Sequence, residues 1–388
     1  MKILNLYPQP LEQVGTYVRR SCKIERQDDD QIINSRVLWY EFPEIENLPT
    51  DTDSESYLIA VIMEAMLENR KIVVHGRVSR ELLANLTEYR DAWCCWLPQV
   101  YHPVDFQVDE IVDNVVRLPS AVCAFSGGVD ATFSVWRHAK TKNGYRSQAI
   151  KTCAIIHGFD IPLQNEEAFV TAFNQASATL KSIDIPLLPI RTNFRKVIWT
   201  NWEHVFAAAL VAALQNFKKI VGTCLIGSSE PYKSLVFPWG SSPITDHLLS
   251  SEEFRVLHDG ATHSRTQKVA TINEWKEGCD NLRVCWQGAL KDRNCGKCEK
   301  CLRTMFNFKA NNLNIPACFR ESSISDKSLF QIRASNDAVL SEWGEILDSA
   351  ICNNVQDNWV KILSLTLNYQ RALKSIKRFL KLVLRKGK

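Results

Sequence analysis

The sequence lacks several features that would place the protein in common classes. No apolar run approaches the roughly 20 residues that a membrane-spanning helix needs. The chain starts with only a short apolar patch, MKILNLYPQP, whereas a signal peptide has an apolar core of about 7–15 residues. The phosphate-binding patterns G-x-x-x-x-G-K-[ST] and G-x-G-x-x-G are also missing. These absences predict a cytoplasmic protein that binds phosphate, if at all, through another kind of loop.

The part of the chain before residue 371, called the body here, also lacks an excess of basic residues. The chain's net charge of +4 depends on residues 371–388, which contain eight basic side chains and no acidic one. Without them, 39 basic residues face 43 acidic ones. Because proteins that grip tRNA or DNA over a broad face are usually basic, we expect no stable nucleic-acid binding by the body. The tail is expected to be a solvated helix packed on the body, with weak contact to an anionic surface or a partner as the alternative.

The cysteines do not form the pattern of a disulfide framework. There are thirteen, an odd number, and several of them lie close together in the sequence. With no export signal, this predicts reduced thiols and a metal site.

The chain has 388 residues, 45% of them hydrophobic, which is enough for more than one globular domain. Residues 1–115 read as a small α/β domain without a recognisable chemical motif. From residue 118, apolar strands alternate with amphipathic helices, which predicts an α/β fold with a Rossmann-like parallel sheet covered on both faces. The expected strands are 121–125, 151–157, 186–192 and 219–227, with helices at 130–140, 165–183 and 202–217. Residues 228–300 read as irregular, and we expect domain boundaries near 115 and 305, with a helical region over 306–388.

The first strand of this pattern ends in SGGVDAT, residues 126–132. Gly127 and Gly128 allow backbone N–H groups to approach an anion, and the helix that follows adds the positive end of its dipole. Ser126 and Thr132 offer hydroxyl groups. Asp130 would repel phosphate unless a cation lay between them, so it predicts Mg²⁺ bound together with a nucleotide. The alternative is a plain strand-to-helix turn.

Two further strand ends belong to the same edge of the predicted sheet. His157 ends the second strand, where it could face the nucleotide or simply form a turn with the glycine that follows. Gly227 ends the fourth strand, within GSSEPY, and is expected to line the phosphates or the substrate.

The cysteine cluster is CWQGALKDRNCGKCEKC, which contains Cys285, Cys295, Cys298 and Cys301. Four thiolates with C-x2-C steps suit tetrahedral Zn²⁺. An iron–sulfur cluster and four unliganded thiols are the alternatives, and nearby Cys279 could replace one ligand.

The stretch SGGVDAT resembles the PP-loop, S-G-G-x-D-[ST], of the ATP pyrophosphatases in the adenine nucleotide alpha-hydrolase superfamily, although Ala131 stands where that superfamily usually has serine. Together with the cysteine spacing, it resembles the family of 7-cyano-7-deazaguanine synthase. The segment RTQKVATI, residues 265–272, resembles that family's T-K-x-E-I segment, which implies that Lys268, with Arg265 beside it, lies near the phosphates. The resemblance covers about residues 118–305.

The resemblance implies an ATP-dependent ligase. Such an enzyme adenylates a carboxylate or amide oxygen, releases pyrophosphate, and lets ammonia or an amine displace AMP. Its cofactors would be ATP with Mg²⁺ and a structural Zn²⁺, its substrate a small-molecule or protein-linked acid, and its assembly a homo-oligomer. Asp130, Lys268 and Arg265 would neutralise the leaving pyrophosphate, and His258, Asp259 and His263 are candidate acid–base or substrate-binding residues. The alternatives are a tRNA-thiolating enzyme of the same superfamily and a non-catalytic ATP-binding regulatory subunit.

Overall fold

The computed structural model describes the chain except for residues 45–46, 114, 286–290, 320–325, 333, 335 and 387–388. The described residues form two compact units. The first contains residues 1–229 and 237–261, and the second contains residues 230–236 and 262–388. These units do not coincide with the three segments expected from the sequence, and each is described here by itself.

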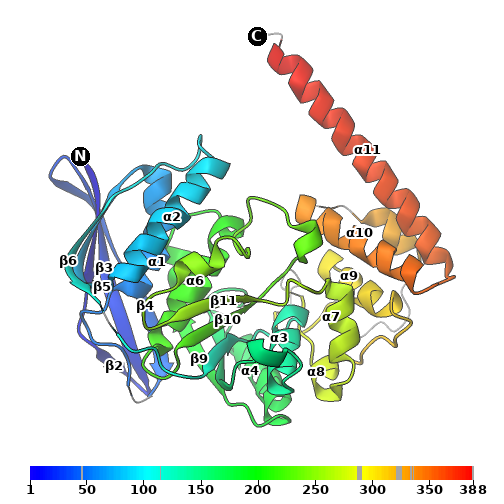
Figure 1. Ribbon diagram of the computed structural model, residues 1–388, viewed down its shortest axis with the longest axis horizontal. Coiled ribbons are helices and arrows are strands. Elements are labelled where there is room, and N and C mark those ends of the chain that lie inside the picture. The colour runs from blue at the N-terminus through cyan, green and yellow to red at the C-terminus, as the bar shows by residue number, and fades with distance from the viewer. Residues whose placement is uncertain are drawn as a thin grey trace. The chain divides into compact units, whose positions relative to one another are not determined.

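The first unit is built on one mixed, mostly parallel sheet (Figure 1). Its strands lie in the order β11-β10-β7-β8-β9-β4-β3-β1-β5-β6, and β2 pairs with β3. Their bounds are β1 (Lys2–Pro8), β2 (Glu12–Val14), β3 (Tyr17–Asp28), β4 (Gln31–Pro43), β5 (Lys71–Ser79), β6 (Phe106–Val112), β7 (Ala121–Ala124), β8 (Ile150–His157), β9 (Leu187–Thr192), β10 (Thr223–Gly227) and β11 (Arg255–Asp259).

The five strands from β7 to β11 are mutually parallel, and the alternating pattern predicted the first four of them. Their order, β11-β10-β7-β8-β9, reverses direction at β7: the next strand in sequence lies on one side of it, and β10 lies on the other. Strand β11 falls within the segment that the sequence pattern indicated as irregular. Because all five strands are parallel, their carboxyl ends share one edge of the sheet, with the order reversal between β7 and β10.

Helices cover both faces of these strands (Figure 1). One face is covered by α3 (Val129–Ala139) and α4 (Glu166–Lys181), and the other by α6 (Trp202–Leu214). Helix α6 is apolar nearly all round, and residues from Val205 to Leu214 are buried at almost every position, as the sequence predicts. It packs against α1 (Glu55–Glu68), which is also buried along most of its length.

The strands of residues 1–115 do not form a separate sheet. Strand β4 pairs antiparallel with β9 through Tyr40 and Thr192, which joins them to the parallel strands. Helices α1 and α2 (Arg80–Trp96) pack on this part of the sheet, and α1 also packs on α6. One apolar core therefore joins the N-terminal strands and helices α1 and α2 to α6 and the parallel strands.

The second unit is helical, as expected for the end of the chain. It contains α7 (Arg265–Ile272), α8 (Lys276–Asp280), α9 (Glu299–Lys309), α10 (Asp337–Cys352) and α11 (Asn358–Lys386). Trp359, Leu363 and Leu367 recur at helical spacing on α11 and are buried with Phe306 of α9 and Trp343 of α10. Further along α11, Ile376 is 56% exposed, and Lys374 pairs with Asp337 of α10 at 2.7 Å. Among the described helices, none is long and apolar enough to cross a membrane.

A buried ion-pair cluster joins the two halves of the first unit. The ammonium of Lys218, whose side chain is 2% exposed, pairs with Asp53, with Glu55 at 2.6 Å and with Glu253 at 3.4 Å. Although burial opposes it, the Lys218 charge lowers the pKa of Glu55. Asp53 and Glu55 come from the N-terminal half and Glu253 from the segment before β11, so one cation links three distant stretches of chain.

We expect Lys218→Met to lower the free energy of unfolding by about 3–5 kcal/mol, because it leaves buried carboxylates without their counter-charge. The control is Lys219→Met: Lys219 also pairs with Glu253, but its side chain is 40% exposed. Its loss should cost at most about 1 kcal/mol. Urea unfolding of the three proteins tests this, and equal losses for the two variants would contradict it.

Candidate functional site

The glycine loop, residues 126–128, leaves β7 and enters α3. It begins after Phe125, whose N–H donates to the carbonyl of Ala154 on β8 at 2.8 Å and so extends the ladder by one residue. Gly127 has φ of +77°, a conformation that glycine adopts without strain. Gly128 is the N-cap of α3, and no side chain caps that helix. The N-cap glycine thus offers no side-chain acceptor to the first-turn N–H groups of α3, and helix N-termini of this kind bind anions.

The polar side chains of this loop differ in their surroundings. Ser126 is exposed, and its Oγ accepts the N–H of Gly128 at 3.4 Å. Asp130 is half-buried in the first turn of α3. Thr132, only 1% exposed, belongs to the inner side of the helix. The position of Ser126 and Asp130 fits a role at an anion site better than the position of Thr132 does.

Gly227 lies directly against the start of α3. A Cβ atom at this position would lie 2.8 Å from the main-chain oxygen of Asp130, closer than packed atoms allow. Glycine here therefore lets the end of β10 approach the first turn of α3. The structure brings Gly227 and the glycine loop together at the order reversal of the sheet, as their strand positions predicted.

His157 has a structural environment. Its side chain is fully buried, Nε2 lies 3.0 Å from the carbonyl oxygen of Pro162, and its ring stacks on Phe169 at 4.3 Å. Burial lowers the pKa of this imidazole. Of the two roles left open by the sequence, these contacts favour the one in which His157 holds the turn after β8.

Two acidic residues, Asp259 and Asp246, hold the end of β11 in place. Their partners were not identified from the sequence. Asp259 pairs with Arg137 at 3.4 Å and His138 at 3.1 Å, both on α3. Although burial opposes it, hydrogen bonding to His138 and the two positive groups lower the pKa of Asp259. Asp259 thus anchors the helix that carries the glycine loop.

The second acidic residue is Asp246, which is fully buried in the turn before β11. Its carboxylate accepts the Ser241 hydroxyl at 2.7 Å and the Ser242 N–H at 3.0 Å, and it lies 2.7 Å from Nδ1 of His258. Asp246 therefore holds the loop of residues 238–246 against β11. The candidate His258 belongs to this buried cluster, whereas His263 lies in the second unit.

Lys268 and Arg265 lie on α7, in the second unit. Ser264 and Gln267 form a capping box at the start of this helix, which explains why it begins there. Lys268 is fully buried, and Arg265 pairs with Glu342 of α10. Their approach to a nucleotide stays a prediction.

The four cysteines of the cluster converge, as their spacing predicted. The sulfur atoms of Cys285, Cys295, Cys298 and Cys301 all lie within 4.8 Å of one another. Two of these distances are 3.6 Å (Cys285 to Cys298) and 3.9 Å (Cys295 to Cys301). Four thiolates at about 2.3 Å around a tetrahedral ion would lie about 3.8 Å apart, so the donor set fits one metal ion.

Local hydrogen bonds shape this cluster. Gly296, with φ of +72°, forms the turn after Cys295, and the N–H of Cys298 donates to the Cys295 sulfur at 3.2 Å. Hydrogen bonding from Cys301 lowers the pKa of the Cys298 thiol, which favours its thiolate form. Arg303, two residues after Cys301, pairs through its guanidinium with Glu299 and Glu342.

Asn294 supports the cluster from behind and was not identified from the sequence. Its Oδ1 accepts the N–H groups of Val284 at 2.9 Å and Cys285 at 3.3 Å, and its Nδ2 donates to the carbonyl of Leu282 at 2.8 Å. Asn294 therefore fixes the segment that carries the first cysteine beside the other three. Its position immediately before Cys295 was the one feature of the sequence that could have indicated this role.

A comparison of the chain with protein families, with curated proteins and with solved structures finds no match.

We expect about one tetrahedrally bound metal ion per chain, and loss of that ion in Cys298→Ser, because removal of one thiolate opens the donor set. The control is Cys352→Ser, since Cys352 is exposed at the end of α10. Elemental analysis and thermal unfolding of freshly reduced protein measure both effects. Metal-free wild-type protein, or a Cys298→Ser variant with full metal content, would contradict the assignment.

Proposed function

We propose that the protein is an ATP-dependent ligase of the ATP pyrophosphatase type, which adenylates a substrate carboxylate and releases pyrophosphate. The observation that carries this proposal is the position of the glycine loop. It follows β7 at the order reversal of five parallel strands, and it opens a helix without a side-chain cap. Ligands of open α/β sheets bind at this place, and the loop presents backbone N–H groups there.

Asp130, in the first turn of α3, restricts which ligand the loop can bind. A simple anion would be repelled by Asp130, which lies half-buried within the same turn of α3. A nucleotide that carries a divalent cation turns this repulsion into attraction, because carboxylate and phosphate oxygens both coordinate Mg²⁺. ATP with Mg²⁺ therefore fits the loop better than an uncomplexed phosphate does.

In the proposed reaction, residues of the glycine loop, α3 and α7 bind the phosphates and offset their charge. The N–H groups of Gly127 and the first turn of α3 would hold the phosphate oxygens, and that of Gly128 would join them by exchanging its contact with Ser126. Asp130 would hold Mg²⁺, which would neutralise phosphate charge. A carboxylate oxygen of the substrate attacks the α-phosphate, and the bond to the β-phosphate breaks. Ammonia or an amine then attacks the acyl carbon, AMP leaves and a proton is released. Lys268 and Arg265 would assist the leaving pyrophosphate; Arg265 would first have to exchange its contact with Glu342.

The metal proposed for the cysteine cluster is zinc. All four donors are thiols, which suits Zn²⁺, and a four-thiolate site has no open position for a substrate. Zinc would therefore stabilise the second unit rather than take part in the reaction.

Two alternatives use the same loop. A tRNA-thiolating enzyme needs reactive cysteines, yet burial raises the pKa of both Cys279 and Cys318 to about 12, and the body of the chain is acidic. A non-catalytic ATP-binding subunit would bind ATP without forming AMP. The acid substrate, the homo-oligomeric state, the cytoplasmic location and the weak contact of the tail with anionic surfaces stay predictions.

We expect the protein, given ATP, Mg²⁺, ammonium and a panel of carboxylic acids, to form AMP and pyrophosphate. In Asp130→Ala the rate should fall by about 10²–10³, because phosphate charge loses its counter-charge in the transition state. The control is Asp109→Ala, at an exposed position on β6 at the opposite end of the sheet. The measurement is ³¹P NMR of the products.

Three outcomes separate the candidates. ADP with phosphate as the main product, or full activity of Asp130→Ala, would contradict the proposal. ATP binding without any turnover favours the regulatory subunit. Sulfur incorporation into tRNA by the intact protein favours the thiolating enzyme.

A further inference from the structure

A small cavity lies at the carboxyl ends of β8 and β9. The segments 158–164 and 192–196 enclose a volume of about 220 Å³, with Phe159, Pro162 and Leu163 contributing apolar walls. A second cavity of about 260 Å³, which includes Trp202 in its lining, shares Arg195 with the first. Strand β8 is the neighbour of β7, so the cavity opens on the same edge of the sheet as the glycine loop.

The walls of the first cavity are held by short-range contacts. Gly158 has φ of +110°, and a Cβ atom there would lie 2.0 Å from the main-chain oxygen of Thr192. Its N–H donates to the carbonyl of Ile161 at 2.9 Å. The side chain of Asn193 accepts the N–H of Trp39 at 3.0 Å and donates to the carbonyl of Val37 at 2.8 Å, both on β4. These contacts fix the two segments that line the cavity.

Two cations line this cavity, Arg195 and Lys196. The Arg195 guanidinium lies 4.1 Å from the ring centre of Trp202, which orients its planar fork. Within the described part of the chain, neither cation has a carboxylate within 4 Å or a side-chain hydrogen bond.

The charge of Arg195 is incompletely compensated. Burial lowers the pKa of its guanidinium, and Asp160, on the loop after β8, is the carboxylate that opposes this effect. Glu166 follows Asp160 closely in the sequence, but its carboxylate lies 3.6 Å from both His157 and Arg191 and not beside Arg195. The cavity thus combines apolar walls with two positive groups and one weakly opposing carboxylate.

We propose that this cavity binds the carboxylate end of a small acid with an apolar body, with two N–H groups of the Arg195 guanidinium on the two carboxylate oxygens and Lys196 beside it. A guanidinium matches a carboxylate through two parallel N–H···O bonds, and the apolar walls suit an uncharged body. The inference rests on the proposed function, because it assigns this cavity to the acid that the ligase would use. A phosphate group has related chemistry, so the test must separate the two.

The test uses the full chain without ATP, and 4-fluorobenzoate as the probe. We expect ¹⁹F NMR titration to show saturable binding of 4-fluorobenzoate and at least tenfold weaker binding of 4-fluorobenzamide, its uncharged analogue. Arg195→Gln combined with Lys196→Gln should weaken 4-fluorobenzoate binding at least tenfold. Arg195→Lys keeps the charge but loses the two parallel N–H groups of the guanidinium, so it should weaken 4-fluorobenzoate binding less. Asp160→Asn should strengthen the binding.

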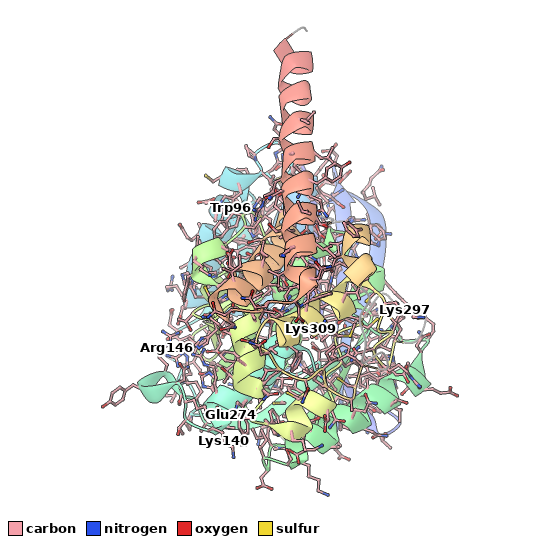
Figure 2. The ribbon with its side chains drawn as sticks, turned by 90° about the vertical axis from the view of Figure 1, so that its right-hand side faces the viewer. Trp96, Lys140, Arg146, Glu274, Lys297 and Lys309 are labelled. Carbon is pink, nitrogen blue, oxygen red and sulfur yellow. The ribbon has the colours of Figure 1, made fainter. Side chains whose placement is uncertain are left out.

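The control is Lys140→Gln. Lys140 also lies against a tryptophan, with its ammonium 5.1 Å from the ring centre of Trp136, but it is the C-cap of α3, at the end of the helix away from the glycine loop. Lys140 is labelled in Figure 2. The variant should bind 4-fluorobenzoate as the wild type does, and thermal unfolding of every variant shows whether the fold is retained.

Equal binding of benzoate and benzamide, or wild-type affinity in the double variant, would overturn the inference. Tighter binding of phenyl phosphate than of 4-fluorobenzoate would assign the cavity to a phosphate and overturn it as well. These results are independent of AMP formation. Loss of the carboxylate site with AMP still formed removes only this inference, whereas carboxylate binding without any AMP removes the proposed reaction and leaves the site.

Discussion

The order reversal between β7 and β10 is the constraint on which the proposed site depends. Strand β8 lies on one side of β7 and β10 on the other. Open α/β sheets bind ligands outside the carboxyl ends of their strands at such a point. The residues at this point are the ones that allow close approach: Gly127 in the loop, Gly128 at the uncapped helix start and Gly227 against the oxygen of Asp130. Asp259 then fixes α3 to the last parallel strand, so the loop rests on a rigid helix.

The sequence predicted the parts of the fold that have a local signal. Strands β7, β8 and β9, and helices α3, α4 and α6, lie where the apolar periodicity placed them, because each is long or strongly patterned. Strand β11 was not predicted, since its five residues carry polar side chains at both ends. Nor was the single mixed sheet: the pairing of Tyr40 with Thr192 joins segments about 150 residues apart and leaves no trace in local composition.

The candidate site shows the same division. The cysteine spacing predicted a convergent four-thiol cluster, because C-x2-C steps force neighbouring sulfurs together. Asn294 behind it, Asp246 under His258 and the pairing of Asp259 with α3 depend on three-dimensional contacts and could not be read from single residues. Lys268 shows the reverse case: the sequence resemblance proposed a role, and the structure places the residue in a different compact unit from the glycine loop.

The central claim is that ATP binds with its phosphates on the glycine loop. The most direct measurement is a crystal structure of the protein with Mg²⁺ and α,β-methylene-ATP, which cannot be cleaved at the proposed bond. The account predicts the triphosphate between the ends of β7 and β10, on the N–H groups of Gly127 and Gly128, with Mg²⁺ between it and Asp130. A nucleotide bound elsewhere, with the loop empty, would contradict the account.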